Sequence, residues 1–581
     1  MRENNNCSIA MIGGGPAALL LLKNMLDHAF LPDKIYVFEK SNRFGTGMPY
    51  SKYGSGKEHV ANVSANELPN FTIDFETYIR DHPTSDYPDF VSDGSVNPYQ
   101  VIPRLLLGDY LEFQFDWYIH QLREKGVEMI CKKNCPVKDI VRAKEPMLYH
   151  IISENDNVFL ASTIILCTGH TWPKKNEGTV KNWYDSPYPP SKFVGPNNFS
   201  VAIRGTSLTA IDAVKTLARL NGHFEYVDKD HLKYQLNPES EKFRIDLFST
   251  GGFLPALRFH SEGEAYSNDW IMSLPEIYEY KRQHGGFVDL DYVFEINFKK
   301  PLKKKDPAFY NQIKDLSIEA FVEKMLSIRK ELDSFDLFEA EYKEAEKSID
   351  RHKPISWKEA LAAFSYAMNY PAKHFSAEDM LRLRKTLLPL ISIIIASLPQ
   401  GSYKELMALY DAGIIDLIQV DKESHVEPGT DGGGIYHYQS PDKKPIEKYY
   451  PMFVDAIGQQ PMDLADLNFD GLKEDQLVST AYLNFKDNQN AEELLKEDTD
   501  DPIFRSFQDQ YSLRVHGLEI NDYFQSLNNY GAIIDSLYIM AVPFIGGLNP
   551  DYSGLDFCDT AAERIVNSLL SKKSRIMNFT D

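Results

Sequence analysis

A glycine-rich turn near the start of this chain restricts its fold more than any other part of the sequence. Residues 7–12 (CSIAMI) have the composition of a short buried strand, and the run GGGP at 13–16 follows them. Residues 17–26 have the pattern of an apolar helix, and residues 34–39 (KIYVFE) have that of a second strand. A strand, a glycine turn, a helix and a second strand in this order begin a Rossmann-like α/β unit.

The spacing inside this turn is the fingerprint of a dinucleotide site. In Gly13-x-Gly15-x-x-Ala18, the first glycine permits the tight turn, the second lets the backbone approach a pyrophosphate, and the small third residue lets helix and strand pack closely. Glu39 ends the second strand about 20 residues later, where a carboxylate accepts hydrogen bonds from a ribose. The alternative is a structural glycine turn beside a surface glutamate. The contacts that we expect with the dinucleotide are Gly13, Gly15, Pro16, Ala17, Ala18, Glu39 and Lys40.

A second unit of the same kind follows later in the chain. Residues 199–203 are mostly apolar, the turn that contains Gly205 and Ser207 is small and polar, and residues 211–220 are helix-like. Two such units in one chain are the arrangement of two-cofactor flavoproteins, in which FAD occupies the first. At Ser207 a side chain stands where the second glycine is expected, and its Cβ crowds the approach of a pyrophosphate.

The fold class expected from these patterns is α/β, with two Rossmann-like dinucleotide-binding units and a large helical insertion. We expect residues 1–197 to form the first part of an FAD-binding domain and residues 198–305 an NAD(P)-binding-like domain. Residues 306–418 have mostly helical patterning and are expected to form the insertion. Residues 419–581 then return to both nucleotide domains and end in a helix on the flavin side.

Charge and hydropathy patterning narrow the choice of partners. A formal net charge of −22 repels nucleic acid and anionic membranes unless a local basic patch intervenes. The lysine-rich run at 299–305 is such a patch, and we interpret it as a solvated turn between domains. The longest apolar run, at 387–398, is too short to span a bilayer. We therefore expect a small-molecule substrate and no nucleic-acid or membrane partner.

The cysteines indicate a reducing compartment. There are five of them, an odd number, and Cys131 and Cys135 are too far apart for a CxxC pair. No signal peptide is recognised ahead of them. We expect a cytoplasmic protein with no structural disulfide and no metal site.

Four further motifs lie around the fingerprint: EKSNRFGTGMPYS at 39–51, HVANVSA at 59–65, a PR…G.YL segment at 103–111 and TGH at 168–170. Together they resemble the FAD/NAD(P)-binding proteins related to the class B, N-hydroxylating flavin monooxygenases. The resemblance covers roughly residues 7–260 and the last 130, and it leaves the helical middle without support.

This resemblance implies further contacts with the flavin cofactor, each of which has a fold-maintaining alternative. The turn at 43–47 would lie beside the pyrophosphate and flavin, the backbone amide of Val137 would bind adenine, and the final helix near 559–561 would point at the flavin ring. An ordinary domain-closing helix is the alternative for the last of these. The residues carried over in this way are Arg43, Gly45, Gly47, Asn62, Arg104, Val137, Thr168 and Gly169.

In the second unit, the sequence GTSLTAID at 205–212 resembles the pattern that holds a nicotinamide dinucleotide in related enzymes. We therefore expect contacts from Gly205, Ser207 and Thr209 with NADPH or NADH. Related proteins often carry arginines after the next strand, where they pair with a 2′-phosphate. Here Arg204 and Arg258 are nearby in sequence, and the alternative for each is an ion pair within the protein.

The function implied by the resemblance is that of an FAD-dependent oxidoreductase, most closely an NAD(P)H-dependent monooxygenase that oxygenates a small amine or other nucleophile through a peroxyflavin. One alternative is a dehydrogenase or reductase that does not activate oxygen. The other is a flavin-binding regulatory or interaction protein whose nicotinamide site has degenerated. The flavin carries the chemistry, so the sequence identifies no catalytic residue, and the insertion suits either a substrate lid or a partner surface.

Overall fold

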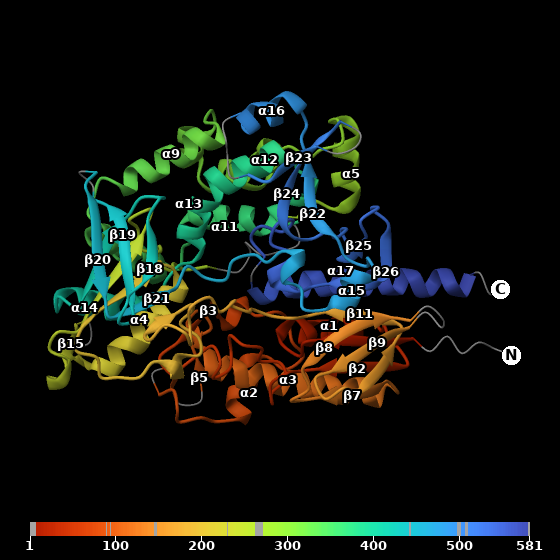
Figure 1. Ribbon diagram of the computed structural model, residues 1–581, viewed down its shortest axis with the longest axis horizontal. Helices are drawn as coiled ribbons and strands as arrows, with labels where there is room; N and C mark the ends of the chain where they lie inside the picture. The colour runs from red at the N-terminus through yellow and green to blue at the C-terminus, as the bar shows by residue number, and fades with distance from the viewer. Residues whose placement is uncertain are drawn as a thin grey trace.

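The computed structural model describes residues 7–88, 90–92, 95–143, 148–228, 231–261, 271–440, 443–496, 501–505, 509–552 and 554–578. Two units built on parallel sheets lie next to each other, and a large helical region lies across both of them (Figure 1). The α/β class with two Rossmann-like units and a large helical part is thereby confirmed.

The first unit is built on a six-stranded sheet with the order β25-β26-β11-β1-β2-β7. All neighbouring strands are parallel except β25 and β26, which pair antiparallel. Every residue of β1 and β11 is buried, as expected of inner strands in a sheet that is covered on both faces. The strands are β1 (Ser8–Ile12), β2 (Lys34–Phe38), β7 (Glu128–Lys132), β11 (Thr163–Leu166), β25 (Gln525–Leu527) and β26 (Ile533–Ile539).

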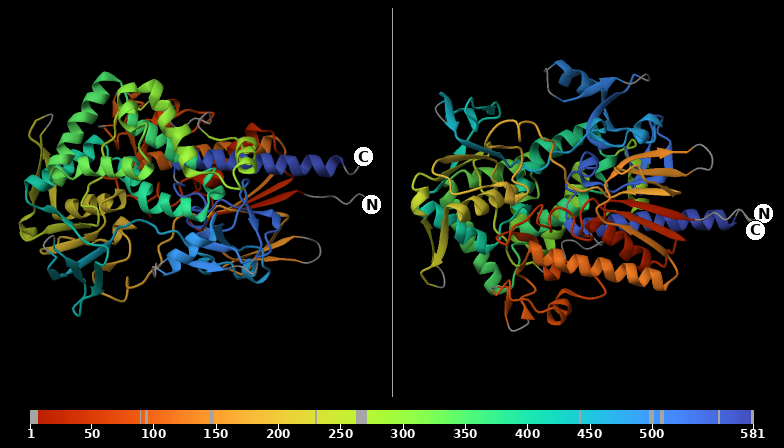
Figure 2. Two further views of the ribbon diagram at one scale, coloured as in Figure 1. Left: turned by 90° about the horizontal axis from the view of Figure 1, so that it is seen from above. Right: turned by 60° about the horizontal axis from the view of Figure 1, so that its bottom comes forward.

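Helices from both ends of the chain pack on this sheet. Helix α1 (Pro16–Asp27) lies against α3 (Arg104–Glu124) and against the last helix, α17 (Gly554–Asn578). The two further views in Figure 2 show α17, in dark blue, running along the N-terminal unit. A small antiparallel sheet of β8 (Val137–Arg142), β9 (Tyr149–Ser153) and β10 (Val158–Ala161) completes this unit.

The second unit is a fully parallel five-stranded sheet with the order β12-β21-β13-β16-β17. The chain runs from β13 through α4 to β16, leaves the sheet for the helical region, and returns at β17 and then β21. The bounds are β12 (Trp183–Tyr184), β13 (Ser200–Arg204), α4 (Leu208–Asn221), β16 (Arg244–Ser249), β17 (Ile415–Gln419) and β21 (Met452–Asp455).

The helical region begins at Leu274, well before the expected start at residue 306. Its helices are α5 (Leu274–Gln283), α6 (Leu290–Phe294), α7 (Lys300–Lys305), α8 (Pro307–Ile313), α9 (Ile318–Arg329), α10 (Ser334–Arg351), α11 (Ser356–Met368), α12 (Ala377–Arg382), α13 (Leu388–Ile395) and α14 (Gln400–Asp411). π-helical turns at Glu295–Lys299 and Leu383–Leu387 join some of them.

The lysine-rich run belongs to these helices and is not the solvated turn that we expected. Lys299 ends a π-helical turn and the following lysines lie in α7. The Lys299 ammonium donates hydrogen bonds to the carbonyl oxygens of Lys314 and Leu316, at 3.1 and 2.8 Å. The apolar residues that alternate with the lysines account for the error, because Phe298 and Leu302 are fully buried.

The helical region shares its interior with both nucleotide units. Phe364 of α11 is buried in the same apolar core as the first sheet, and the Tyr370 ring stacks on Phe557 of α17 with centroids 5.6 Å apart. Phe338 of α10 and Leu406 of α14 belong instead to the core of the second unit. The region is therefore part of the molecular core and not a separate appendage.

Smaller elements complete the structure. A three-stranded antiparallel sheet of β18 (His425–Pro428), β19 (Gly434–Gln439) and β20 (Pro445–Tyr450) covers the second unit, where the Tyr436 and Phe248 rings stack with centroids 3.7 Å apart. A second one contains β22 (Thr480–Asn484), β23 (Ile503–Arg505) and β24 (Tyr511–Leu518). Within the described residues, no helix combines the length and apolar character needed to cross a bilayer.

Candidate functional site

A cavity of about 380 Å³ lies at the carboxyl ends of the strands of the first sheet. This is the edge at which open α/β sheets bind their ligands. The turns after β1, β2 and β11 and the start of α17 all contribute to its wall. The residues expected to contact the dinucleotide that line this cavity are Gly13, Gly15, Pro16, Ala17, Glu39, Lys40, Gly47, Val137, Thr168 and Gly169.

The N-terminus of α1 opens into this cavity without a side-chain cap. Gly15 is the N-cap residue, Pro16 occupies the first turn, and no acidic residue follows in that turn. The first N–H groups of a helix have no partner inside the helix, and the helix dipole adds positive potential at the same point. The site therefore has the electrostatics of a phosphate cradle.

Glycine is needed at positions 13 and 15 for different structural reasons. Gly13 has φ +109°, and a Cβ at this position would lie 2.5 Å from the Cys167 carbonyl oxygen, so the turn requires glycine. A Cβ on Gly15 would lie 3.2 Å from Cα of Gly47, which is tight but not prohibitive. Gly15 and Gly47 thus place bare backbone on the wall of the cavity, where a side chain would take up ligand space.

Glu39 directly follows β2, and its side chain holds the glycine turn after β1 in place. Its carboxylate accepts hydrogen bonds from the backbone N–H groups of Gly14, at 2.9 Å, and Ser41, at 2.7 Å, one on each oxygen. Each oxygen of an ionised carboxylate has a further acceptor site, so both can also receive a ribose hydroxyl. Glu39 lines the cavity, and its role as an acceptor for a ribose stays a prediction.

Three of the expected cofactor contacts serve the fold of the same region. The Arg43 guanidinium pairs with Asp109 and Glu112 of α3, at 2.7 and 2.6 Å. Gly45 has φ +78° and packs against the backbone of α3, and Ala18 is fully buried in α1. Arg43 and Gly45 therefore fix the turn that carries Gly47, and Ala18 permits the close helix packing of the fingerprint.

Arg104 and Asn62 lie elsewhere, where the two nucleotide units meet. Arg104 donates from Nη1 to the Asp212 carboxylate of α4, and from Nε to the Val60 carbonyl oxygen at 2.9 Å. The Asn62 side chain donates to the Ile395 carbonyl oxygen at 3.3 Å. Both residues line a small crevice between the units and not the cavity beside Gly13, so the structure assigns them to the junction.

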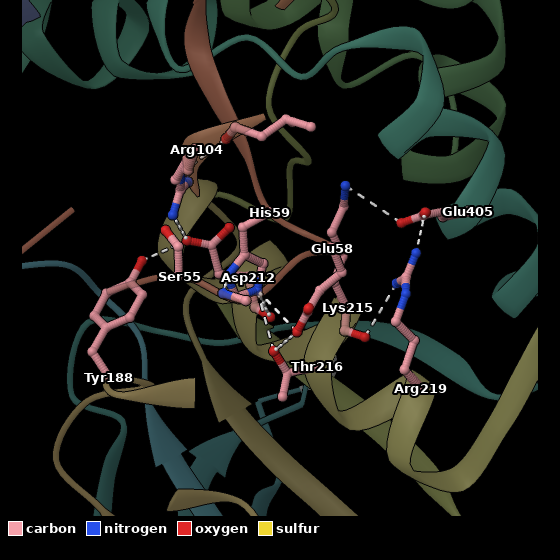
Figure 3. Close-up of polar contacts among 12 residues, drawn as sticks. Ser55, Glu58, His59, Arg104, Tyr188, Asp212, Lys215, Thr216, Arg219 and Glu405 are labelled. Atoms are coloured by element: carbon pink, nitrogen blue, oxygen red, sulfur yellow. Dashed lines mark hydrogen bonds and ion pairs between the residues drawn. The ribbon is translucent and has the colours of Figure 1, made fainter. Parts of the chain in front are cut away.

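Figure 3 shows the polar network around Asp212. Besides Arg104, the Tyr188 hydroxyl donates to Oδ2 of Asp212 at 2.6 Å. Nε2 of His59 lies 3.1 Å from both the Asp212 carbonyl oxygen and the Thr216 hydroxyl. Burial acts to raise the pKa of Asp212, but the positive charge of Arg104 and the neighbouring His59 outweigh it and hold that pKa below its usual value. Asp212 is thus the ionised centre of a buried network that joins the units.

Helix α4 is anchored along its length by further polar contacts (Figure 3). The Thr216 hydroxyl donates to the Glu58 carboxylate at 2.7 Å. Lys215, directly before Thr216, and Arg219, one turn later, approach the Glu405 carboxylate of α14 to 3.4 and 2.6 Å. The helix that follows the second glycine turn is therefore held by both the first unit and the helical region.

The second glycine turn keeps the backbone geometry of a phosphate site. Gly205 has φ +114°, and a Cβ on it would lie 2.7 Å from the Ala456 carbonyl oxygen. Ser207 is the N-cap of α4, its side chain makes no capping hydrogen bond, and the first turn has no acidic residue. Ser207 is exposed, and Thr209 is half-buried beside Gly458. The structure thus brings Gly205, Ser207 and Thr209 together at the carboxyl edge of the second sheet.

The two arginines that were candidates for a 2′-phosphate already have partners. Nη1 of Arg204 lies 3.5 Å from the Asp455 carboxylate. Nη2 of Arg258 donates to both oxygens of the half-buried Glu67 carboxylate, at 2.7 and 2.5 Å, and Nη1 donates to the side-chain oxygen of Asn62. Either arginine would have to give up an ion pair in order to bind a 2′-phosphate.

Sequence reasoning missed the part of the cavity wall that comes from distant segments. A signal was present for Met48, Pro49 and Tyr50, which belong to the motif at 39–51, and for His170 of the motif at 168–170, but none of the four was singled out. Further missed lining residues come from turns after β21 and β26 and from α17, which begins at Gly554, ahead of the expected 559; they include Met462, Phe469, Met540, Pro543, Tyr552, Gly554, Leu555 and Cys558.

Two titratable groups on the cavity wall, the Tyr50 hydroxyl and the Cys558 thiol, keep their protons at neutral pH. Burial raises the pKa of the Tyr50 hydroxyl to about 12 and that of the Cys558 thiol also to about 12. A buried thiol that keeps its proton is not a nucleophile. Chemistry at this site therefore depends on what the cavity binds.

Comparisons with known proteins agree with this geometry. Residues 10–171 match the family model described as FAD-NAD(P)-binding, and residues 274–395 match one described as the YdhS-like middle domain. A protein of Escherichia coli (strain K12), described as "Uncharacterized protein YdhS", is 27% identical over 478 residues, which cover 81% of this chain and 86% of that protein.

Two solved structures show more distant likeness. An ornithine N-hydroxylase from Kutzneria sp. 744 is 12% identical, with a TM-score of 0.48, and covers 98% of this chain and 99% of its own. An L-lysine 6-monooxygenase from Pseudomonas syringae is 12% identical, with a TM-score of 0.44 and the same coverage. Likeness at this level assigns neither a substrate nor an activity to this chain.

The resemblance that the sequence motifs indicated is thus confirmed for the N-terminal unit, where the glycine turn, Glu39 and the cavity lie. The helical middle, which that resemblance left without support, has its own match. The chain contains an FAD-NAD(P)-binding domain and is similar, over most of its length, to the YdhS protein.

Proposed function

We propose that the protein is an FAD-dependent oxidoreductase that takes electrons from NAD(P)H and acts on a small molecule. The observation that carries the proposal is the single cavity at the end of the first sheet, which gathers the fingerprint glycines, Glu39, Val137 and the start of α17. These are the groups that a dinucleotide and a flavin ring require, and they come from four separate segments of the chain.

The residues of the cavity fit FAD in defined roles. The uncapped N-terminus of α1 would hold the pyrophosphate, and Glu39 would accept the ribose hydroxyls. The backbone of Val137 would meet the adenine, and the N-terminus of α17 would face the flavin ring. When bound, FAD supplies hydride and electron transfer, and the protein contributes orientation and electrostatics.

In the second unit, the turn with Gly205, Ser207 and Thr209 would receive the nicotinamide dinucleotide at the start of α4. The paired state of Arg204 and Arg258 favours NADH over NADPH, because no arginine is free at these two positions to bind a 2′-phosphate. The finer proposal is a monooxygenase that oxygenates an amine or another small nucleophile. A dehydrogenase that does not activate oxygen is the nearest alternative.

A second candidate function belongs to a different class. A flavin-binding interaction protein would need the first site only, and the serine at position 207 favours this alternative. The network around Asp212 holds the second unit in place whether or not it binds a nucleotide. Electron transfer from NAD(P)H therefore separates the two candidates.

The test is anaerobic mixing of the FAD-loaded protein with NADH and then with NADPH, followed by the loss of flavin absorbance. The informative variant is Ser207→Asp, since an acid at this N-cap suits the helix but repels a pyrophosphate. Ser317→Asp, at the exposed N-cap of α9, is the matched control.

The oxidoreductase is supported if the wild-type flavin bleaches fast, the rate is at least several-fold lower in Ser207→Asp, and the rate is unchanged in Ser317→Asp. Oxygen uptake by the reduced protein, with release of an oxygenated product, then separates monooxygenase from dehydrogenase. If neither nucleotide bleaches the flavin, the interaction protein is the better account.

A further inference from the structure

A cluster of possible metal ligands lies on the small sheet that covers the second unit, apart from the residues of the FAD cavity. His425 and Glu427 are two residues apart on β18, so their side chains leave the same face of the sheet. His437 on β19 is the direct cross-strand partner of His425. We expected no metal site from the spacing of the cysteines, whereas these histidines are 12 residues apart in the sequence and meet only through strand pairing.

The three side chains converge on one point. Nε2 of His425 lies 3.7 Å from one oxygen of Glu427, and Nε2 of His437 lies 3.8 Å from the other. The two imidazole rings are nearly parallel, with centroids 4.8 Å apart and an interplanar angle of 11°. One ligand atom from each residue lies within 4.8 Å of the other two.

These separations suit coordination better than hydrogen bonding. Both N···O distances exceed hydrogen-bond length. Two ligand atoms bound to one zinc ion at about 2.1 Å are about 3.4 Å apart in tetrahedral geometry, so small rotations of exposed side chains would complete the site.

The surroundings of two imidazole nitrogens favour metal ligation through Nε2 of each histidine. Nδ1 of His425 lies 3.3 Å from the Glu423 carbonyl oxygen, which favours a proton on Nδ1 and a lone pair on Nε2. Nε2 of His437 is buried and makes no hydrogen bond within the described part of the chain. A buried nitrogen in this state costs free energy, and a bound cation would satisfy it.

The opposite face of the sheet fixes the backbone that carries these ligands. Tyr436 stacks on Phe248, and the Tyr450 hydroxyl donates to the Asp246 carboxylate of the second unit. Both tyrosines are almost fully buried. The two histidine backbones are therefore held at their present separation, which reduces the ordering cost of ligation.

We propose that His425, Glu427 and His437 bind a divalent cation of the zinc class. Two imidazoles and a carboxylate are ligands that Zn²⁺ takes in three-ligand sites, with a fourth position left to water. The bound ion ties β18 to β19 and stabilises the sheet over the second unit. This site is independent of the flavin function proposed above.

The test is titration of the tag-free, FAD-loaded protein with ZnCl₂ by calorimetry, together with competition by a chromophoric chelator. The variants are His437→Gln and Glu427→Gln, each of which removes one ligand. His223→Gln is the matched control, because His223 is also an exposed histidine on an antiparallel hairpin, β14–β15 (Gly222–Tyr226 and Leu232–Leu236).

The proposal predicts one Zn²⁺ per chain, at least tenfold weaker binding in both ligand variants, and unchanged binding in His223→Gln. Flavin content should be the same in all four proteins, which confirms that each is folded. The proposal would be overturned if His437→Gln and Glu427→Gln bound Zn²⁺ as tightly as the wild type, or if the wild type showed no saturable binding.

Discussion

At the scale of single residues, Glu39 holds the glycine turn together, and we propose that it also binds a ribose. Its two oxygens accept backbone N–H groups on either side of the turn, and the residue lines the cavity. Its position was predictable because the strand and the glycine spacing determine it. The position of Arg104 was not, because its partner Asp212 lies in another unit and nothing local in the sequence indicates that pairing.

Glu39→Gln is expected to weaken FAD binding by about tenfold to a hundredfold, since hydrogen bonds to a charged group contribute about 1.5–3 kcal/mol. The amide also presents an N–H group to one of the two backbone donors. Equilibrium dialysis with FAD measures the loss. Glu128→Gln on β7, which removes an exposed carboxylate, should bind FAD like the wild type, and equal affinity in Glu39→Gln would contradict the assigned role.

Asp551 predicts a pH dependence of stability. It accepts a hydrogen bond from Ser365 of α11, and burial raises the pKa of its carboxyl to about 6. The folded protein therefore keeps a proton that the unfolded chain has released above about pH 4. The stabilisation from this group is present at low pH and is lost as the pH rises through about 6.

Asp551→Asn removes this dependence. Relative to the wild type, the variant should gain free energy of unfolding between pH 5 and pH 8, by up to about 1.4 kcal/mol for each unit of raised pKa. Urea unfolding at several pH values measures the difference. Asp156→Asn, which removes an exposed carboxylate, should show no such trend, and a pH-independent difference for Asp551→Asn would contradict the assignment.

At the scale of elements, α4 is where the two nucleotide units are joined. Its glycine turn was predictable from the fingerprint-like sequence, and the helix, expected from residue 211, begins at Leu208. Its attachment was not, because Arg104, Tyr188 and Glu405 come from three distant segments. A buried network of this kind fixes the orientation of one unit relative to the other, which hydride transfer between two bound cofactors requires.

Arg104→Met leaves the buried Asp212 carboxylate without its main partner and should cost about 3–5 kcal/mol of unfolding free energy. Lys138→Met, which breaks the exposed pair with Asp156, should cost less than about 1 kcal/mol. Urea unfolding measures both. Adding Asp212→Leu to Arg104→Met should recover part of the loss, and equal costs for the two single variants would refute the role given to the network.

At the scale of the whole molecule, the helical region is built into both cores. The sequence predicted that it is helical but placed its start at residue 306, because the lysine-rich run resembled a linker. Burial of Phe298 and Leu302 within that run reverses this interpretation. The contact of Tyr370 with Phe557 likewise depends on residues far apart in sequence, which no local pattern reveals. A fixed cover over α17 fits these contacts better than a mobile lid.

Because one core spans the first unit and the helical region, FAD release and loss of helical structure should occur in the same urea transition. Phe364→Ala, in the middle of that core, should lower the free energy of unfolding by about 3–5 kcal/mol and move both signals together. Flavin fluorescence and circular dichroism follow the two events. A helical transition that is complete while FAD is still bound would show that the region folds independently.

The measurement that most directly tests the central claim is the number of FAD molecules bound per chain after reconstitution, in the wild type and in Gly15→Val. The valine side chain would occupy the wall where Gly15 faces Gly47, whereas Gly401→Ala adds a methyl group in open space. We predict one FAD per chain for the wild type and for Gly401→Ala, and a large loss for Gly15→Val at unchanged helical content. No FAD in the wild type, or full occupancy in Gly15→Val, would contradict the assignment of this cavity.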